Sequence, residues 1–320
     1  MKKIISICVP AYNESDNIGE FYKKIKEVFE KKIPMYSFEI VYINDGSTDN
    51  TLEKMENVAN LDKNVQVIDL SRNYGKEIAM LAGLEHTTGE ATIIMDSDLQ
   101  HPPEKIPELI HMWEMGYQDV YGKRVTRHKE SMLKIYSSKL YYKILSFLSQ
   151  TKIEDGIGDF RLLDKECVQA LISFRDKQRY TKGLYNEIGF KKIGIEFEAN
   201  ERFAGESKWS TQDLIKLAKD GILSNSLIPL KLSTYFGTAL SLSAFVYFLY
   251  TLVRALLGKT TLPGYSSLMI VLLIIGGVQL ISLGVLGEYV GNIFKESKDR
   301  PIYLINKKNS IVKEEQNSGK

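Results

Sequence analysis

Residues 65–102 read VQVIDLSRNYGKEIAMLAGLEHTTGEATIIMDSDLQHP, and the order of patterns within this stretch decides the fold. Two short apolar runs, Val65–Leu70 and Ala91–Met95, are typical of parallel strands that are covered on both faces. Between them, Tyr74–His86 carries apolar residues at helical spacing. A strand, a helix and a second strand in this order predict one unit of a parallel sheet, with the polar residues after each strand gathered at one edge.

The same alternation extends over the N-terminal part of the chain. Further strands are predicted at Ile4–Val9, Phe38–Ile43 and Asp119–Gly122, and further helices at Ile18–Phe29 and Glu104–Met115. We therefore expect an α/β fold with a doubly wound, mostly parallel sheet. The sequence has neither a Gly-x-Gly-x-x-Gly loop nor a Walker loop, which argues against a dinucleotide-binding dehydrogenase and a P-loop enzyme.

Composition and charge narrow the function classes. The chain has 320 residues, of which 44% are hydrophobic and 26% charged, so wholesale disorder is excluded. A net charge of +2 provides no basic field for nucleic acid, and we expect no such partner. Cys8 and Cys167 lie in apolar patterns, and we interpret both as reduced packing residues.

Two long runs near the C-terminus contain no charged residue. Leu232–Val253 has 22 residues and Thr260–Gly287 has 28, and each exceeds the roughly 20 residues that cross a bilayer as a helix. The alternative is a pair of buried core helices, which are usually shorter and have one polar face. The short linker favours a transmembrane hairpin, and the basic flank that follows it predicts a cytosolic N-terminal part.

Asp96-x-Asp98 directly follows a predicted strand and supplies two carboxylates to one point. Mg²⁺ and Mn²⁺ prefer oxygen ligands and often bind one or two carboxylates together with substrate phosphates. The alternative is an ordinary solvated turn, which accounts for most Asp-x-Asp pairs. His101 could be a further ligand, although it precedes Pro102-Pro103 and could instead orient the loop.

The motifs VPAYNE, INDGSTDNT, YGKRVTR and GDFRLLDK, together with the 65–102 stretch, occur in an order and spacing that resemble the family 2 glycosyltransferases. RFAGESKWS and, after the second apolar run, GEYVGNIFKESKDRP resemble the polyprenyl-phosphate glycosyltransferases, most closely the bactoprenol glucosyltransferases, which are related to dolichyl-phosphate mannose synthase. The resemblance covers about residues 3–305. It implies a GT-A fold, a nucleotide-sugar donor and a lipid phosphate acceptor.

The resemblance also assigns roles to individual positions. Five residues match family positions that hold the base and ribose of the nucleotide: Pro10, Tyr12, Glu14, Asp45 and Arg72. Asp96 and Asp98 match the positions of the metal, Mg²⁺ or Mn²⁺, and of the donor diphosphate, and Gln100 lies beside the donor sugar. Asp159 matches a position proposed as catalytic.

Two positions depart from the family pattern. Asn44 stands where relatives more often have Asp, which puts a role in base recognition in doubt, and Lys76 stands where they often have His. Each assigned residue also has a plain structural alternative: Asp45 could form a turn, Arg72 a surface ion pair, and Asp159 a local cap or a pair with Arg161.

The function that the resemblance implies is inverting transfer of a single hexose to undecaprenyl (polyprenyl) phosphate, and we expect glucose from UDP-glucose as the donor. Because a phosphate monoester is largely dianionic at neutral pH, it needs cations to hold it and no base to deprotonate it. We expect the acceptor-binding residues among the following basic side chains: Arg124, Arg127, Arg161, Arg202 and Lys208.

Other readings remain open. The donor sugar could be N-acetylglucosamine, galactose or mannose from GDP-mannose. A processive polysaccharide synthase shares the nucleotide-binding half, but its Gln-x-x-Arg-Trp signature is absent and one hairpin offers few spans for a polymer channel. A catalytically silent membrane scaffold would tolerate loss of the acidic pair.

The expected organisation has six parts. They are a cytosolic GT-A domain at 1–208, an interfacial amphipathic helix at 209–229, transmembrane helices at 230–256 and 265–291, an external loop at 257–264, and a cytosolic tail at 292–320. We expect a multi-pass protein of the bacterial cytoplasmic membrane with both termini in the cytosol. Glycines in the second span, such as Gly276, Gly284 and Gly287, predict close helix contacts and permit a homo-oligomer.

Overall fold

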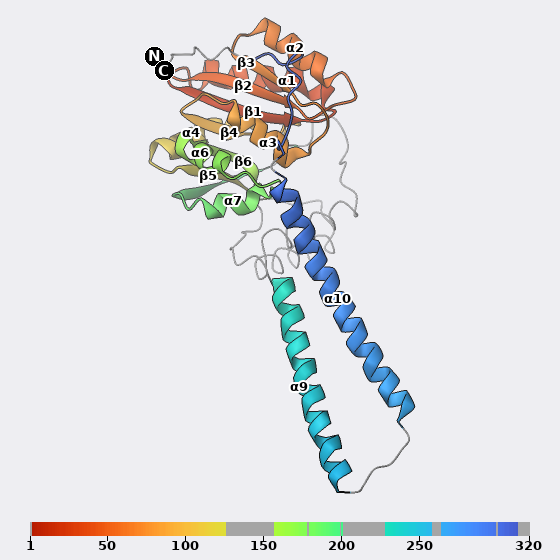
Figure 1. The fold of residues 1–320 in the computed structure, drawn as a ribbon. Coiled ribbons are helices and arrows are strands. Elements are labelled where there is room, and N and C mark those ends of the chain that lie inside the picture. The colour runs from red at the N-terminus through yellow and green to blue at the C-terminus, as the bar shows by residue number, and fades with distance from the viewer. Residues whose placement is uncertain are drawn as a thin grey trace, which may run out of the picture. The chain divides into compact units, whose positions relative to one another are not determined.

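The computed structural model describes residues 2–125, 157–177, 179–198, 200, 228–257, 264–298 and 300–312. The chain divides into two compact units, one built on a sheet and the other on two long C-terminal helices (Figure 1). The predicted interfacial helix at 209–229 lies outside the described residues except for its last two positions.

The first unit is built on a seven-stranded sheet with the order β3-β2-β1-β4-β6-β5-β7. Its strands are β1 (Ile4–Ala11), β2 (Ser37–Asn44), β3 (Val65–Asp69), β4 (Ala91–Ile94), β5 (Asp119–Arg124), β6 (Ile157–Asp164) and β7 (Lys192–Phe197). All pairings are parallel except those of β6, which runs antiparallel to both β4 and β5. The mostly parallel sheet confirms the predicted fold class, and its first five strands are those that the sequence predicts.

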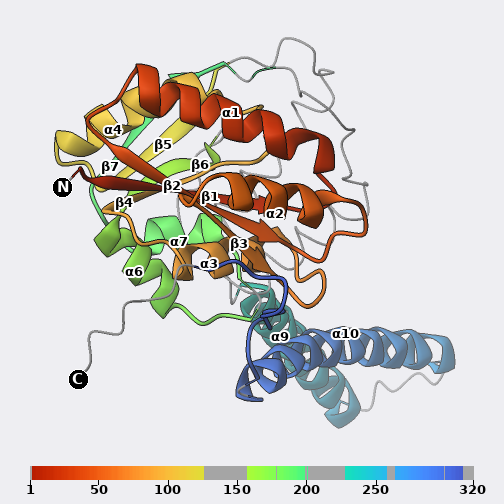
Figure 2. The same cartoon turned by 90° about the horizontal axis from the view of Figure 1, so that it is seen from above.

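Helices cover both faces of the sheet (Figure 2). On one face lie α1 (Ser15–Lys31), α2 (Thr51–Leu61) and α4 (Ile106–Glu114), the last preceded by the short 3₁₀ helix η1 (Pro103–Lys105). On the other face lie α3 (Lys76–Glu85), α6 (Lys165–Ser173) and α7 (Thr181–Glu187). Because each face has its own buried apolar cluster, the strands are covered on both sides, as their nearly continuous apolar runs require.

Helix α3 approaches the sheet closely because residue 83 is a glycine. A Cβ atom at Gly83 would lie 2.4 Å from the Cys8 Sγ and 2.5 Å from the Ile43 Cδ1. Both Cys8 and Cys167 are buried free thiols, which confirms their interpretation as packing residues. The first residue of α3, Lys76, contacts Asp96 after β4 and Asp159 of β6.

Residues 300–312 follow the second long helix and pack against the outer edge of β3. Ile311 and Ile305 form antiparallel bridges with Val67 and Leu70, respectively. The Asp69 carboxylate accepts a hydrogen bond from the Asn309 Nδ2 at 3.0 Å. The tail predicted as a separate segment is therefore, in this part, an addition to the sheet that covers its exposed edge.

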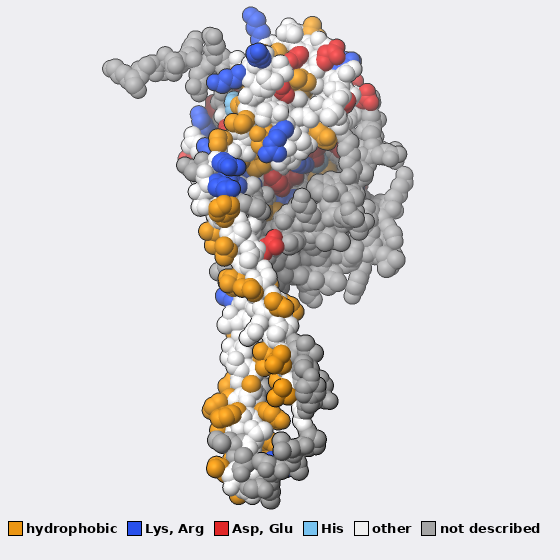
Figure 3. All heavy atoms as spheres, turned by 45° about the vertical axis from the view of Figure 1, so that its right-hand side comes forward, with side chains coloured by type: hydrophobic (Ala, Val, Ile, Leu, Met, Phe, Trp, Pro, Cys, Tyr) orange, Lys and Arg blue, Asp and Glu red, His pale blue; other side chains and the backbone are white. Residues whose placement is uncertain are grey.

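The second unit consists of α9 (Ile228–Leu256) and α10 (Tyr265–Ser297). Within them, Leu230–Thr251 and Ile274–Phe294 are long and apolar enough to cross a membrane. Their large hydrophobic side chains are mostly exposed, as the orange surface in Figure 3 shows, so these are not the core helices of a soluble domain. The Ser233 and Ser282 hydroxyls are hydrogen-bonded at 2.6 Å and connect the two helices.

Two details differ from the sequence prediction. Helix α10 continues to Ser297, beyond the predicted end of the span at 291. A Cβ atom at Gly276, Gly284 or Gly287 would meet nothing within 4 Å, so these glycines do not mediate the contact between α9 and α10. The predicted homo-oligomer stays a prediction.

We expect Gly83→Ala to destabilise the sheet unit by about 1–3 kcal/mol, because the added methyl group overlaps buried sulfur and carbon atoms. The matched control is Gly19→Ala in α1, where a Cβ meets nothing within 4 Å. It should be neutral or stabilising by up to about 1 kcal/mol. Denaturant unfolding of the detergent-solubilised chain, followed by circular dichroism, measures both changes. Equal stability of the two variants would contradict this packing.

Candidate active site

The loop after β4 carries the acidic pair at the carboxyl end of the sheet. Asp98 is only 7% exposed, and its Oδ1 accepts a hydrogen bond from the Gln100 amide at 3.1 Å. Leu99 between them has a φ of 60°, a left-handed conformation that costs energy for a residue with a branched side chain. The loop is therefore held in a strained form that turns Asp98 inward and leaves Gln100 half-buried beside it.

His101 connects this loop with strand β6. Its ring stacks on Phe160 with a centroid distance of 5.0 Å, and its Nδ1 accepts a hydrogen bond from the Asp96 amide at 3.3 Å. Burial lowers the pKa of His101, which favours the neutral ring that this acceptor role requires. Because the Nδ1 lone pair is used, the geometry matches the loop-orienting alternative rather than a metal ligand.

The pairing of β6 with β4 brings Asp159 to the acidic pair. In the antiparallel register Ile94 lies opposite Arg161, so a continuation of the register by two residues sets Asp96 opposite Asp159. The Asp159 side chain is 11% exposed, and its Oδ1 is buried without a hydrogen-bond partner in the described part of the chain. A third carboxylate thus faces the loop of Asp96 and Asp98.

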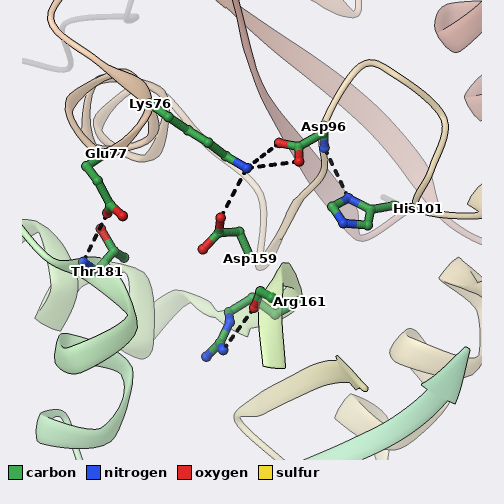
Figure 4. A network of polar contacts seen from close by, with 8 residues as sticks. Lys76, Glu77, Asp96, His101, Asp159, Arg161 and Thr181 are labelled. Carbon is green, nitrogen blue, oxygen red and sulfur yellow. Dashed lines mark hydrogen bonds and ion pairs between the residues drawn. The ribbon is translucent and has the colours of Figure 1, made fainter. Parts of the chain in front are cut away.

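Lys76 connects Asp96 with Asp159 (Figure 4). Its Nζ lies 2.7 Å from the Asp96 Oδ1, 2.9 Å from the Asp96 Oδ2 and 3.1 Å from the Asp159 Oδ2. Burial disfavours the charge on this ammonium, but the attraction of the two carboxylates outweighs it and raises the pKa of Lys76. The same ion pairs outweigh burial at Asp96 and Asp159 and lower the pKa of each, so all three groups are charged at neutral pH.

A second ion pair lies behind Asp159. The Arg161 Nη1 is 2.9 Å from the Asp119 Oδ2, and the guanidinium stacks over the ring of Tyr185 at 3.3 Å. Arg161 is 2% exposed. The charge of Arg161 is thus buried and paired with Asp119, and its predicted contact with the acceptor stays a prediction.

Glu77 ties the site to α7. Its Oε2 accepts a hydrogen bond from the Thr181 amide at 3.0 Å. Burial, with the nearby Asp159 charge, raises the pKa of Glu77. The first two residues of α3 thus contact three neighbouring elements: Lys76 the loop after β4 and strand β6, and Glu77 the start of α7.

The loops after β1 and β2 are connected by hydrogen bonds to side chains. The Asn13 amide donates to the Ser47 Oγ at 3.0 Å, and the Thr48 amide donates to the Asn13 Oδ1 at 2.8 Å. Gly46 has a φ of 65°, and a Cβ there would lie 2.4 Å from the Arg72 carbonyl carbon. Only glycine lets the loops after β2 and β3 approach this closely.

Asp45 orders the loop that leads into α3. It is 3% exposed, and its carboxylate accepts hydrogen bonds from the Tyr74 amide at 2.7 Å and the Gly75 amide at 2.9 Å. Burial raises the pKa of Asp45 despite these two hydrogen bonds. Its contact with a nucleotide stays a prediction, whereas its role in placing the loop is visible.

The departure at Asn44 has a physical account. The Asn44 Nδ2 donates to the Asp69 Oδ1 at 2.7 Å, and the Asn44 Oδ1 accepts from the Ser47 amide at 3.1 Å. A carboxylate at position 44 would face Asp69 without a proton to donate. Asn44 is 3% exposed and therefore serves the sheet edge, where Asp69 also binds the tail.

Of the remaining predicted residues, five are described by the structure and three are not. Pro10, Tyr12, Glu14 and Arg72 belong to the carboxyl ends of β1 and β3, with Arg72 exposed and stacked over Tyr74 at 4.3 Å. Arg124 ends β5 and is exposed at the same edge of the sheet as Asp96. Arg127, Arg202 and Lys208 lie outside the described residues.

The acidic residues fit a divalent cation that a ligand completes. Among the described residues, no group of three His, Cys, Asp or Glu side chains gathers into a full metal site. Asp96 and Asp98 supply carboxylate oxygens, and the unpartnered Asp159 Oδ1 adds acceptor capacity nearby. Two carboxylates plus phosphate oxygens are a donor set that Mg²⁺ and Mn²⁺ commonly use.

Sequence reasoning missed the bridging role of Lys76 and the strand that carries Asp159. In the sequence, Lys76 stands out only as a departure from the family pattern. Its place at the start of a helix that follows a parallel strand is a signal, because such helix starts lie at the ligand-binding edge. The contacts of Glu77 with Thr181 have no comparable signal, since they depend on how α7 folds back.

Two family models and several relatives match this chain. Residues 6–172 match the model of glycosyl transferase family 2, and residues 228–293 match that of the GtrB C-terminal hairpin. An uncharacterized glycosyltransferase of Synechocystis sp. is 40% identical over 302 residues, which are 94% of each chain. The bactoprenol glucosyl transferase of Shigella phage SfX is 41% identical over 301 residues, which are 94% of this chain and 98% of the relative.

Among solved structures, glucosyl-3-phosphoglycerate synthase from Mycobacterium tuberculosis is 17% identical, with a TM-score of 0.48 and coverage of 69% of this chain and 78% of the other. At this TM-score the similarity carries no argument about the reaction. The family assignment instead follows from the matched domain model and from relatives that align over nearly their whole length. The chain therefore belongs to glycosyl transferase family 2 and carries the C-terminal hairpin of the GtrB type.

Proposed function

We propose that this protein transfers one glucose from UDP-glucose to undecaprenyl (polyprenyl) phosphate, with inversion, at the cytosolic face of the bacterial cytoplasmic membrane. The observation that carries the proposal is the acidic site of Asp96, Asp98 and Asp159 at the ligand-binding edge of the sheet, in a chain that also has a membrane-type hairpin. Relatives at about 40% identity that are named bactoprenol glucosyl transferases support the choice of sugar and acceptor.

The proposed acceptor explains why the reaction needs no general base. A phosphate monoester has a second pKa near 6, so its oxygen is already a nucleophile at neutral pH and needs no general base. The Asp159 carboxylate is paired with the Lys76 ammonium at 3.1 Å, which lowers its pKa. We infer that Asp159 positions Lys76, since the acceptor has no proton that must be removed.

The bond changes are those of a direct displacement. A phosphate oxygen of the acceptor forms a bond to the anomeric carbon as the bond from that carbon to the donor diphosphate breaks, and the nucleoside diphosphate leaves. A Mg²⁺ or Mn²⁺ ion held by Asp96 and Asp98 would stabilise the charge that develops on the diphosphate. Tyr12, Glu14 and Arg72 would hold the nucleoside, and Gln100 would lie beside the sugar.

The proposed lipid acceptor explains why the chain carries an apolar hairpin. The polyprenyl chain of the acceptor stays in the bilayer and only its phosphate reaches the surface. Two apolar helices keep the enzyme at that surface. We propose that the loop at 257–264 faces the outside and that the sheet unit and the tail lie in the cytosol, as the basic residues after α10 favour.

Asp96→Asn and Asp98→Asn should each lower the rate of transfer by about 100-fold or more, since each removes a carboxylate that holds the cation and the leaving diphosphate. The measurement is the rate of lipid-linked glucose formation by purified enzyme. Asp16→Asn, an exposed carboxylate in the first turn of α1, is the control and should keep the wild-type rate. Near-normal rates in both site variants would refute the cation site.

Arg124→Ala should raise the KM for polyprenyl phosphate by about tenfold, because a charge-assisted hydrogen bond to phosphate is lost. The kcat at saturating acceptor should change much less. Lys123→Ala is the matched control, because the neighbouring residue of a strand points to the opposite face. An unchanged acceptor KM in Arg124→Ala would remove Arg124 from the acceptor site.

The proposed topology can be tested in intact cells without a cysteine-free background. Cys8 and Cys167 are buried, and burial raises the pKa of each to about 12, so neither thiol should react. A membrane-impermeant maleimide should label Lys259→Cys in intact cells and Lys307→Cys only after lysis. The reverse pattern would contradict the orientation.

A further inference from the structure

The Lys76 ammonium lies between two carboxylates of the acidic site. Its ammonium contacts both oxygens of Asp96, at 2.7 and 2.9 Å, and also Asp159 at 3.1 Å. Asp96 is one of the two carboxylates that the proposed function assigns to a divalent cation. A single side chain thus already contacts both oxygens of a metal-binding residue.

Charge balance shows why the ammonium is there. Asp96, Asp98 and Asp159 bring three negative charges to one edge of the sheet, and two of them are largely buried. Carboxylates this close repel one another unless a cation lies between them. Lys76 is the basic side chain that contacts two of these carboxylates in the described residues.

A divalent cation and the Lys76 ammonium would repel each other if both were bound to Asp96. Each carboxylate oxygen can accept a second ligand, but a cation bound to Asp96 would lie close to the Lys76 charge and be repelled by it. Asp159 offers the ammonium another partner, because its Oδ2 is already at 3.1 Å and its Oδ1 is buried without a partner in the described residues. Arg161 lies on the same strand as Asp159, but its charge is balanced by Asp119 of β5.

We propose that Lys76 is the counter-cation of the metal-free site, and that binding of a divalent cation at Asp96 moves the Lys76 ammonium from Asp96 to Asp159. This inference rests on the proposed function, because it takes the cation site of that reaction as given. Asp159 acts through Lys76 and is a positioning residue. The affinity of the site for metal is thereby set by a lysine that is not itself a ligand.

The test is a double-mutant cycle on Mn²⁺ affinity, measured by electron paramagnetic resonance of the free ion with full-length, detergent-solubilised enzyme and no donor or acceptor. Lys76→Met should bind Mn²⁺ about fivefold more tightly than the wild type, because the competing charge is gone. Asp159→Asn should bind it more weakly, because the ammonium then has only Asp96. In the Lys76→Met background, Asp159→Asn should have a much smaller effect.

Two further variants control the cycle. Lys105→Met removes a lysine of similar exposure, 34% against 36%, which pairs with Glu108 at 2.7 Å outside the site, and it should leave Mn²⁺ affinity unchanged. Lys76→Arg keeps the positive charge and should bind Mn²⁺ less tightly than Lys76→Met. Without metal, Lys76→Met should also melt at a lower temperature than the wild type and gain more from added Mg²⁺.

Equal Mn²⁺ affinity of the wild type and Lys76→Met would overturn the inference, as would the absence of Mn²⁺ binding in every variant. Weakening by Asp159→Asn to the same degree in both backgrounds would also overturn it, since Asp159 would then act independently of Lys76. None of these measurements involves sugar transfer. A failure of the proposed reaction would therefore appear in the turnover assay and not in the cycle.

Discussion

The antiparallel pairing of β6 with β4 is the constraint on which the site depends. It inserts one reversed strand into a parallel sheet and sets Asp159 opposite the loop of Asp96. Three carboxylates at one edge would repel one another, and the Lys76 ammonium between two of them makes the arrangement stable. Helix α3, which begins with Lys76, packs closely on the sheet at Gly83.

The carboxyl ends of β2 and β3 are also where the segment at 300–312 joins the sheet. Asn44 and Asp69 stabilise the end of β2 and β3, and Asp69 also binds the segment that follows the hairpin. The chain thus returns to the sheet after α10 and adds to its outer edge next to the loop of Arg72. A phosphate acceptor is already ionised at neutral pH, so the proposed reaction needs no general base.

Much of the fold, although not helix α2, could be predicted from the sequence, because five strands and the helices α1, α3 and α4 between them have strong apolar periods. The acidic pair could be located for the same reason, since Asp96 and Asp98 directly follow a buried strand. Strand β6 escaped prediction because Asp159 and Arg161 interrupt its apolar pattern, and β7 because most of its residues are not buried. The bridging by Lys76 and the burial of Arg161 depend on strand register, which composition and periodicity do not encode.

The central claim is that a cation-dependent acidic site transfers sugar to a lipid phosphate. Its most direct test incubates the purified enzyme with radiolabelled UDP-glucose and undecaprenyl phosphate and follows the label into the organic phase. The account predicts labelled lipid, no labelled lipid with a chelator, and recovery on addition of excess Mg²⁺ or Mn²⁺. Undiminished transfer in the presence of the chelator, or label that never leaves the aqueous phase, would contradict it.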